Sequence, residues 1–330
     1  MKDLRTPNKP ISFQEQQHAK WNTPPEAIAN VVKMATKVEP VGFERIIAGE
    51  ANEVYDVTTI NGNVIVRISR SDDIPFERER WAITKSKAQG VPVPEILLVH
   101  REQINNENLA FCVDQKIAGT PLSSLLGTID QAILEPISRE AGKILSKIHR
   151  VQTNGFGDLD AEGKGEFTSL DEYIMQPTRE QDQLLRIAKK HQKPESLITR
   201  PVQILLGNRM LFDGPGLLLH NDYSPKHILV ENGRINGIID FETCRGGDPV
   251  LDLARWTYYY GDNEMFSWLK SGYENKEIFD DNFAKKMIAY RIFKALSLVS
   301  YYDWIGGDSM QDFHWKKLEE DTALFEQTYA

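Results

Sequence analysis

The stretch LLLHNDYSPKHILVENGRINGIIDFE, residues 217–242, combines short apolar runs with acids at their ends. Its opening apolar run ends shortly before Asp222. The runs ILV at 228–230 and INGII at 235–239, separated by a polar turn, predict a β-hairpin that ends at Asp240. Because an acid at the end of a rigid strand is held in a fixed position, we expect the chemistry of this protein here.

The chain before this stretch begins with residues that favour a small antiparallel sheet. Five runs have the composition or alternation of strands, and they cover residues 41–48, 53–60, 63–68, 95–100 and 109–116. Asn61-Gly62 predicts a two-residue hairpin turn between the second and third runs. A helix is expected at residues 76–88, before Gly90 and a Pro-containing segment, and a shorter amphipathic helix after Pro25.

The chain beyond residue 116 is mostly helical in its pattern. Apolar residues at helical spacing predict helices at about 133–148, 170–175, 181–190, 249–256, 263–272, 281–303 and 311–328. Asp248 before Pro249 is a helix start, with a capping carboxylate and a proline in the first turn. The predicted fold class is therefore α+β, with a polar lead-in at 1–25, a β-rich domain at 26–116 and a helical domain at 117–330.

The composition is that of an ordinary globular protein. The 330 residues are 41% hydrophobic and 26% charged, and the net charge of −9 argues against a nucleic-acid partner. Two distant cysteines give neither a disulfide framework nor a zinc-ligand spacing, which indicates a reduced, cytoplasmic setting. No signal peptide or apolar run long enough for a membrane span is expected, and the sequence carries no indication of an oligomeric state.

The polar residues of the two halves suit phosphoryl transfer. That reaction needs backbone amides and a cation that bind the nucleotide phosphates, and a carboxylate that orients this cation. It also needs a second carboxylate that binds the acceptor hydroxyl, and groups that bind a metal ion. The residues that this layout offers for these tasks are Gly49 to Asn52, Arg67, Glu79, Asp222, His227 and Asp240.

These features together resemble the aminoglycoside phosphotransferases and related small-molecule kinases of the protein-kinase-like fold. The motifs that carry the resemblance are HNDYSPKH at 220–227, IDFE at 239–242, GDPVLDLA at 247–254, and RE at 78–79 followed by VPVP at 91–94. NGFG at 154–157 and LDEY at 170–173 are most similar to the hygromycin phosphotransferase branch. The resemblance implies a two-lobed fold, with a small sheet and one inserted helix in the N-lobe and a helical C-lobe.

The resemblance also implies roles for single residues, with ATP and Mg²⁺ as cofactors. Asp222 matches the base that accepts or orients the acceptor hydroxyl, and Asp240 matches the principal magnesium ligand. Gly49 and Asn52 fall in the phosphate-covering loop, and Glu79 matches the helix carboxylate. The hinge groups that would contact adenine are expected at Gln115 and Ile117.

Two positions depart from the usual family pattern. Arg67 stands where most members carry lysine, and His227 stands where asparagine is usual. Arginine still supplies a cation for phosphates, whereas a histidine nitrogen is a poorer ligand for magnesium than an oxygen. Three roles for His227 therefore stay open. It binds the metal directly, it binds the metal through a water molecule, or Asp240 provides most of the metal binding. His220 is expected to be structural, and a zinc site of His220, Asp222 and His227 is a weaker alternative.

The expected activity is transfer of the ATP γ-phosphate to a hydroxyl of an aminoglycoside-type antibiotic, a cationic small molecule. A same-fold kinase of a metabolite or a macrolide and a non-catalytic nucleotide-binding protein remain alternatives. The acceptor is expected beside an aromatic and acidic region, in which ordinary helix packing is the competing explanation for each residue. This region comprises Trp256, Tyr258, Tyr259, Tyr260, Tyr301, Tyr302, Asp303, Trp304 and Asp308.

Overall fold

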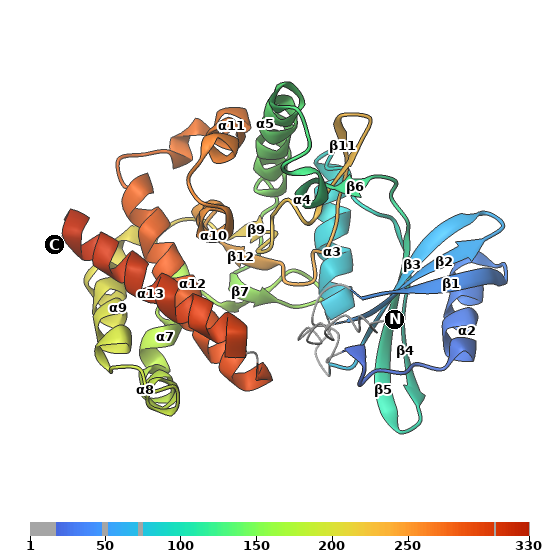
Figure 1. Ribbon diagram of the computed structural model, residues 1–330, viewed down its shortest axis with the longest axis horizontal. Helices are drawn as coiled ribbons and strands as arrows, with labels where there is room; N and C mark the ends of the chain where they lie inside the picture. The colour runs from blue at the N-terminus through green and yellow to red at the C-terminus, as the bar shows by residue number, and fades with distance from the viewer. Residues whose placement is uncertain (1–17, 48–51, 72–74, 307, 330) are drawn as a thin grey trace, which may run out of the picture. The chain divides into compact units, whose positions relative to one another are not determined.

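The computed structural model describes residues 18–47, 52–71, 75–306 and 308–329, and the chain forms two compact units (Figure 1). The first unit comprises residues 1–76 and 94–116, and the second comprises residues 77–93 and 117–330. Gly49 and most of the predicted lead-in lie outside the described residues. Among the described helices, none is both long enough and apolar enough to cross a membrane.

The first unit is a five-stranded antiparallel sheet with one helix packed against it. Its elements are α2 (Pro25–Thr36), β1 (Pro40–Ile46), β2 (Glu53–Thr59), β3 (Gly62–Ser69), β4 (Ile96–Ile104) and β5 (Glu107–Gln115), and the strand order is β1-β2-β3-β5-β4. The predicted hairpin between β2 and β3 is present, but its turn lies one residue earlier than expected. Thr59 pairs with Gly62, so Ile60 and Asn61 are the turn residues and Gly62 is the first residue of β3. β4 and β5 are longer than expected, because the polar residues between them continue both strands up to a tight turn. At that turn Asn105 and Asn106 adopt positive φ values of 52° and 66°.

The side chains of β3 alternate between two faces of the sheet, as its sequence predicts. One face is apolar and the other carries Arg67. Val64, Val66 and Ile68 are buried in one core with the apolar face of α2. Arg67 points to the opposite face, where its guanidinium lies 5.3 Å from the centroid of the Phe76 ring. The sheet therefore buries its apolar side under α2 and carries the predicted nucleotide-binding cation on its other side.

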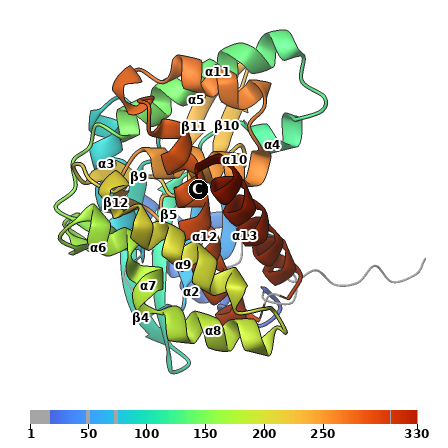
Figure 2. The ribbon, with the colours of Figure 1, turned by 90° about the vertical axis from the view of Figure 1, so that its left-hand side faces the viewer.

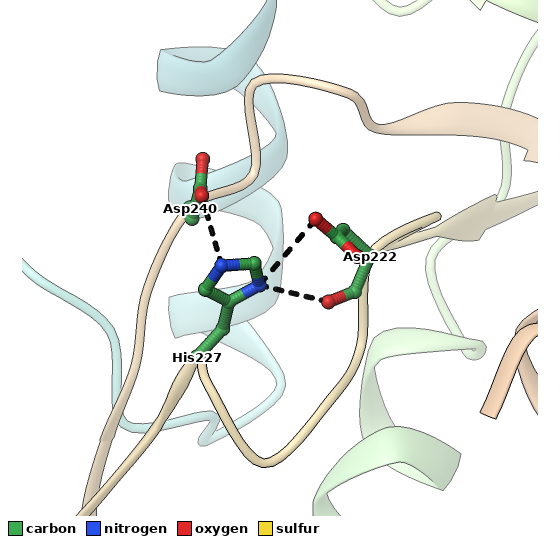
Figure 3. Close-up of side chains that lie close together, drawn as sticks. All are labelled: Asp222, His227 and Asp240. Carbon is green, nitrogen blue, oxygen red and sulfur yellow. Dashed lines mark hydrogen bonds and ion pairs between the residues drawn. The ribbon is translucent and has the colours of Figure 1, made fainter. Parts of the chain in front are cut away.

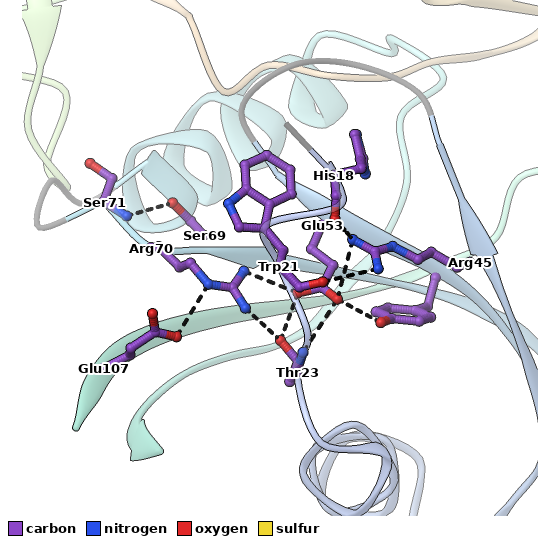
Figure 4. Close-up of polar contacts among 10 residues, drawn as sticks. His18, Trp21, Thr23, Arg45, Glu53, Ser69, Arg70, Ser71 and Glu107 are labelled. Atoms are coloured by element: carbon purple, nitrogen blue, oxygen red, sulfur yellow. Dashed lines mark hydrogen bonds and ion pairs between the residues drawn. The ribbon is translucent and has the colours of Figure 1, made fainter. Parts of the chain in front are cut away.

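A buried carboxylate fastens the segment before α2 to this sheet (Figure 4). Glu53, at the start of β2, is fully buried and accepts hydrogen bonds from the Thr23 hydroxyl at 2.7 Å and the Tyr55 hydroxyl at 2.6 Å. Arg70 forms an ion pair with it at 3.0 Å, and Arg45 lies 3.6 Å from it. A buried carboxylate is tolerated only when its oxygens are paired in this way, so residues near Thr23 are part of the folded unit.

The second unit is mainly helical and holds two small sheets (Figures 1 and 2). It begins within α3 (Pro75–Ala88) and continues with β6 (Thr120–Pro121), α4 (Leu122–Leu125), α5 (Gln131–Ile148), β7 (Phe156–Leu159), β8 (Gly165–Phe167), α6 (Leu170–Ile174), α7 (Gln176–Arg179), α8 (Gln181–Lys190), α9 (Ser196–Gly207) and η1 (Arg209–Leu211). Then follow β9 (Leu217–Leu219), β10 (Ile228–Glu231), β11 (Arg234–Ile238), β12 (Arg245–Gly247), α10 (Val250–Tyr260), α11 (Glu264–Gly272), η2 (Lys276–Ile278), α12 (Phe283–Ile305) and α13 (Asp308–Tyr329). The predicted hairpin of the opening stretch is the β10–β11 pair, which also pairs with β6.

Helix α3 groups with the second unit, whereas the sequence analysis assigns it to the N-lobe. The guanidinium of Arg78 lies 3.5 Å from the carbonyl oxygen of Leu159. Gly163 lies so close to the Trp81 ring that a methyl group in place of its hydrogen would collide with the indole. The charged and aromatic side chains of α3 therefore bind it to loops that follow much later in the chain.

A histidine is buried where α12 packs against α13. Its burial predicts that the folded protein loses stability in acid. His314 is fully buried, and its Nδ1 lies 2.8 Å from the Tyr258 hydroxyl. Burial, together with the cations of Lys294 and Arg255, lowers the pKa of His314 from 6.5 to about 3. The folded protein keeps this ring neutral while the unfolded chain protonates it. The stabilisation is therefore full above pH 6.5 and is lost as the pH falls toward 3.

We expect the free energy of unfolding to fall by several kcal/mol between pH 7 and pH 4. As long as the ring stays neutral in the folded protein, the decrease is about 1.4 kcal/mol for each pH unit below 6.5. His314→Gln should flatten this dependence, because glutamine does not titrate. Urea unfolding at a series of pH values measures it, and His100→Gln in β4 is the matched replacement. Equal pH slopes for the wild type and His314→Gln would contradict the prediction.

Candidate functional site

The loop of residues 220–227, here called the Asp222 loop, connects β9 to β10. A single buried acid, Asp252, binds the backbone at the start of this loop. Asp252, in the first turn of α10, is fully buried and accepts hydrogen bonds from the amides of His220 at 2.9 Å and Asn221 at 2.8 Å. His149 lies 3.0 Å from the same carboxylate. Asp252 thereby fixes the start of the loop.

His220 is confirmed as a structural residue. Its Nδ1 accepts a hydrogen bond from the amide of Asp222 at 3.3 Å, and its Nε2 lies 3.1 Å from the carbonyl oxygen of Ile239. A carbonyl only accepts, so Nε2 carries the proton and the ring is neutral. Both nitrogens are occupied by backbone groups, which argues against the alternative zinc site.

Asp222 is paired with an arginine that the sequence analysis did not single out. Nε and Nη2 of Arg255, on α10, lie 3.0 Å and 2.7 Å from the same oxygen, Oδ1, of Asp222. Burial opposes ionisation of Asp222, but the charges of Arg255 and His227 outweigh it, so the pKa of Asp222 lies below its usual value. Asp222 is thus a fixed carboxylate that stays ionised at neutral pH.

His227 lies between the two acids of the opening stretch (Figure 3). Its Nδ1 is 2.9 Å from the backbone oxygen of Asp222 and therefore donates a hydrogen bond. Its Nε2 is 3.1 Å from Oδ2 of Asp240. Nε2 of His227 and Oδ2 of Asp240 are therefore close enough to act as two ligand atoms of one cation.

The three side chains fit a divalent cation. One ligand atom from each of Asp222, His227 and Asp240 lies within 4.8 Å of the others. Two carboxylates and one imidazole form a mixed oxygen and nitrogen set, which accepts magnesium and suits manganese better. Asp240 has a positive φ of 71°, a conformation that bulky side chains rarely adopt and that functional sites often contain.

Glu79 supports the segment that carries Asp240. Its carboxylate is fully buried and accepts a hydrogen bond from the amide of Phe241 at 3.0 Å. The predicted helix carboxylate therefore holds the backbone immediately after Asp240 in place.

A comparison with known protein families identifies the chain. The model of the phosphotransferase enzyme family (APH) matches residues 42–273, which is more than two thirds of the sequence. The chain belongs to this phosphotransferase family. The recognition made from the sequence motifs is therefore confirmed.

Individual relatives of this phosphotransferase agree with the predicted branch and fold. It is 25% identical over 215 residues to hygromycin-B 4-O-kinase of Escherichia coli, and the match covers 62% of this chain and 59% of that enzyme. A thermostable mutant of aminoglycoside phosphotransferase APH(4)-Ia, in a ternary complex with AMP-PNP and hygromycin B, has a TM-score of 0.75 at 15% identity and covers 90% of this chain and 98% of its own. A putative fructosamine-3-kinase from Haemophilus somnus 129PT has a TM-score of 0.64 at 15% identity and covers 89% of this chain and 96% of its own. The structural matches confirm the α+β, protein-kinase-like fold, with a small antiparallel sheet in the N-lobe and a helical C-lobe.

The predicted nucleotide-binding residues of the phosphotransferase divide between the two units. In the first unit, Nε and Nη2 of Arg67 lie 2.9 Å and 2.8 Å from Oδ2 of Asp114, and Asn52 is buried. The amide of Gln115 donates a hydrogen bond to the carbonyl oxygen of Glu95 at 2.8 Å.

In the second unit, the Ile117 side chain packs against Gly237. Among the backbone–backbone hydrogen bonds of the described part of the chain, none has the amide of Ile117 as donor.

The aromatic region predicted for the acceptor is partly helix packing. Trp256 and Tyr258 are buried, whereas Trp304 is 81% exposed. Asp303 is an ion-pair partner of Lys190 at 2.7 Å and of His191 at 2.8 Å. The side chain of Asp308 lies outside the described part of the structure.

Lys294 is a second basic residue near the Asp222 loop that the sequence analysis did not single out. It lies on α12, and its Nζ is 3.5 Å from Oδ1 of Asn221. Burial and the neighbouring cations of Arg255 and Arg245 lower the pKa of Lys294 well below its usual value. A lysine on a long apolar helix was the one available sequence signal for such a position.

Proposed function

We propose that this protein is an ATP-dependent kinase that transfers the γ-phosphate to a hydroxyl group of a small molecule. The observation that carries the proposal is that Asp222, His227 and Asp240 lie within 4.8 Å of one another, the first two on the loop that Asp252 braces. This arrangement supplies a carboxylate for the acceptor hydroxyl beside a site for a divalent cation, which are the parts that phosphoryl transfer requires.

In the proposed mechanism, Asp222 accepts a hydrogen bond from the acceptor hydroxyl and orients its oxygen toward the phosphorus in line with the leaving group. Arg255 fixes the Asp222 carboxylate, so little reorganisation is needed when the acceptor binds. Asp240 and His227 would hold Mg²⁺, which neutralises phosphate charge when it is bound. The proton of the hydroxyl passes to Asp222 or to the transferred phosphate.

Arg67 is proposed to bind nucleotide phosphates from the first unit, where Asp114 orients its guanidinium. Gly49 and Asn52 are proposed to cover the phosphates, and Gln115 and Ile117 to contact the adenine.

The family relatives support an aminoglycoside antibiotic as the acceptor, since the curated relative is hygromycin-B 4-O-kinase and a structural relative binds hygromycin B. A second acceptor class, hydroxylated acids, is favoured by the cations Arg255 and Lys294 beside Asp222. The two classes carry opposite charge, so one panel of acceptors separates them.

The proposal is tested by ADP release from Mg·ATP in the presence and absence of single acceptors, with ³¹P NMR of the product. We expect release that depends on an acceptor hydroxyl, and no phosphorylated protein intermediate. Nucleotide binding without turnover, across aminoglycosides, macrolides, sugars, amino alcohols and hydroxy acids, would favour a non-catalytic nucleotide-binding protein instead.

The ligand role of His227 is tested by its replacement with asparagine, the residue usual at this position. Nitrogen ligands favour Mn²⁺ over Mg²⁺, so His227→Asn should lower the ratio of Mn²⁺ to Mg²⁺ affinity by about 10-fold or more. Calorimetric titration of each metal into the enzyme–ADP complex measures this ratio without turnover. An unchanged ratio would mean that His227 does not contact the metal directly.

A further inference from the structure

Two helices of the second unit bring cations to the Asp222 loop. Arg255 lies on α10 and Lys294 on α12, and these helices pack against each other. Arg255 uses two N–H groups on Asp222, and its guanidinium lies 5.4 Å from the centroid of the Tyr259 ring. A guanidinium has five N–H donors, so three of them have no protein acceptor among the described residues.

Lys294 has no acid partner in the described part of the chain. Its one hydrogen bond there is the 3.5 Å contact with the neutral side chain of Asn221. Since its side chain is largely removed from water and lies near Arg255 and Arg245, the ammonium form is disfavoured. A bound anion would supply the missing counter-charge and restore that form.

Three described acids that could bind an ammonium group of the acceptor are already paired with basic residues. Asp321, the buried acid of α13, pairs with Arg291 at 2.6 Å. Asp303 is occupied by Lys190 and His191, and Asp222 by Arg255. The charge next to the reacting position is therefore suited to an anion.

We propose that Lys294 and Arg255 form an oxyanion subsite that binds a carboxylate or phosphate group of the acceptor, next to the hydroxyl that Asp222 orients. Lysine supplies a compact ammonium with three donors, and the unused donors of Arg255 can share the same anion. The acceptor class is then a hydroxylated acid or a sugar phosphate. This inference rests on the proposed kinase function, and it specifies in addition that the acceptor substrate is negatively charged.

Sulfate titrated onto the complex of the enzyme with Mg·AMP-PNP probes the subsite directly, because the nucleotide occupies the other phosphate positions. The indole N–H signal of Trp256, which follows Arg255 in the chain, is the NMR reporter. We expect saturable binding to the wild type and at least about 10-fold weaker binding to Lys294→Met, since a charge-assisted hydrogen bond is worth about 1.5–3 kcal/mol. Lys286→Met on the same helix is the matched control and should bind sulfate like the wild type.

Paired acceptors then test the class of substrate. Glycerate and glycerol 3-phosphate are compared with glycerol, which carries hydroxyl groups without an anion. We expect kcat/KM to favour the anionic partners by at least about 10-fold in the wild type and to lose this preference in Lys294→Met, with the KM for ATP unchanged.

Several results would overturn the subsite. One is equal sulfate affinity in the wild type and Lys294→Met, and another is a loss of ATP affinity in Lys294→Met without a change in acceptor preference. If cationic aminoglycosides are phosphorylated and the anionic acceptors are not, the kinase proposal stands and the subsite is wrong. If no acceptor of any charge supports ADP release while sulfate binds as expected, Lys294 and Arg255 do bind an anion, but the kinase proposal fails and the assignment of this site to an acceptor fails with it.

Discussion

Asp222→Asn is expected to lower kcat by about 10²–10⁴-fold, the range typical of a lost acid–base group. The substitution keeps an oxygen that can accept a hydrogen bond from Arg255, so the loop should keep its shape. It removes the negative charge that would orient the acceptor hydroxyl and receive its proton. Nucleotide affinity, measured by calorimetry with ADP, should change by less than about threefold, because the effect is on turnover alone.

The matched control is Asp262→Asn, since Asp262 is an exposed acid in the turn after α10. It should leave turnover and the thermal midpoint unchanged. Near-normal turnover in Asp222→Asn would show that another group positions the acceptor, whereas a large fall in nucleotide affinity would show that the variant disturbs the whole site.

Asp252→Ala is expected to destabilise the protein by about 3 kcal/mol or more, because three buried donors lose their acceptor and each unsatisfied group costs about 1–3 kcal/mol. The amides of His220 and Asn221 and the imidazole of His149 would all lose their acceptor in a dry environment. Urea unfolding measures the change in free energy. Turnover should also fall, because the Asp222 loop would no longer be fixed at its start.

Asp252→Asn separates the two effects, since an amide keeps one acceptor oxygen at the same position. We expect it to recover part of the lost stability and part of the turnover. Wild-type stability in Asp252→Ala would mean that water replaces the carboxylate, and the bracing role of Asp252 would then be minor.

The sheet and most helices could be predicted because their signals are local. The Asn-Gly pair at 61–62 marks the hairpin to within one residue, and the alternation in β3 assigns Arg67 to the face opposite Val66. Helix α9 was not predicted, because Pro201 within it reads as a break. Strands β7, β8 and β12 were not predicted, because they are only three or four residues long and contain glycine.

The residues of the candidate site that belong to one sequence motif could be predicted. The residues that distant helices contribute to the site could not. Asp222, His227 and Asp240 lie within 19 residues of chain, so their proximity follows from one hairpin. Arg255 and Lys294 reach the same loop only through the packing of α10 against α12. Helical periodicity says which residues share a face of a helix, but not which other segment that face contacts.

Glu53 defines how far the chain can be shortened from its N-terminus. A chain that starts at Pro24 would keep α2 and the whole sheet, yet it would lose the hydroxyl and amide of Thr23 that bind Glu53. The backbone oxygens of His18 and Trp21, which hold Arg45, would be lost as well. Limited proteolysis that trims the chain past Thr23 should therefore be followed by rapid degradation of the sheet, whereas trimming that stops before His18 should leave a resistant core.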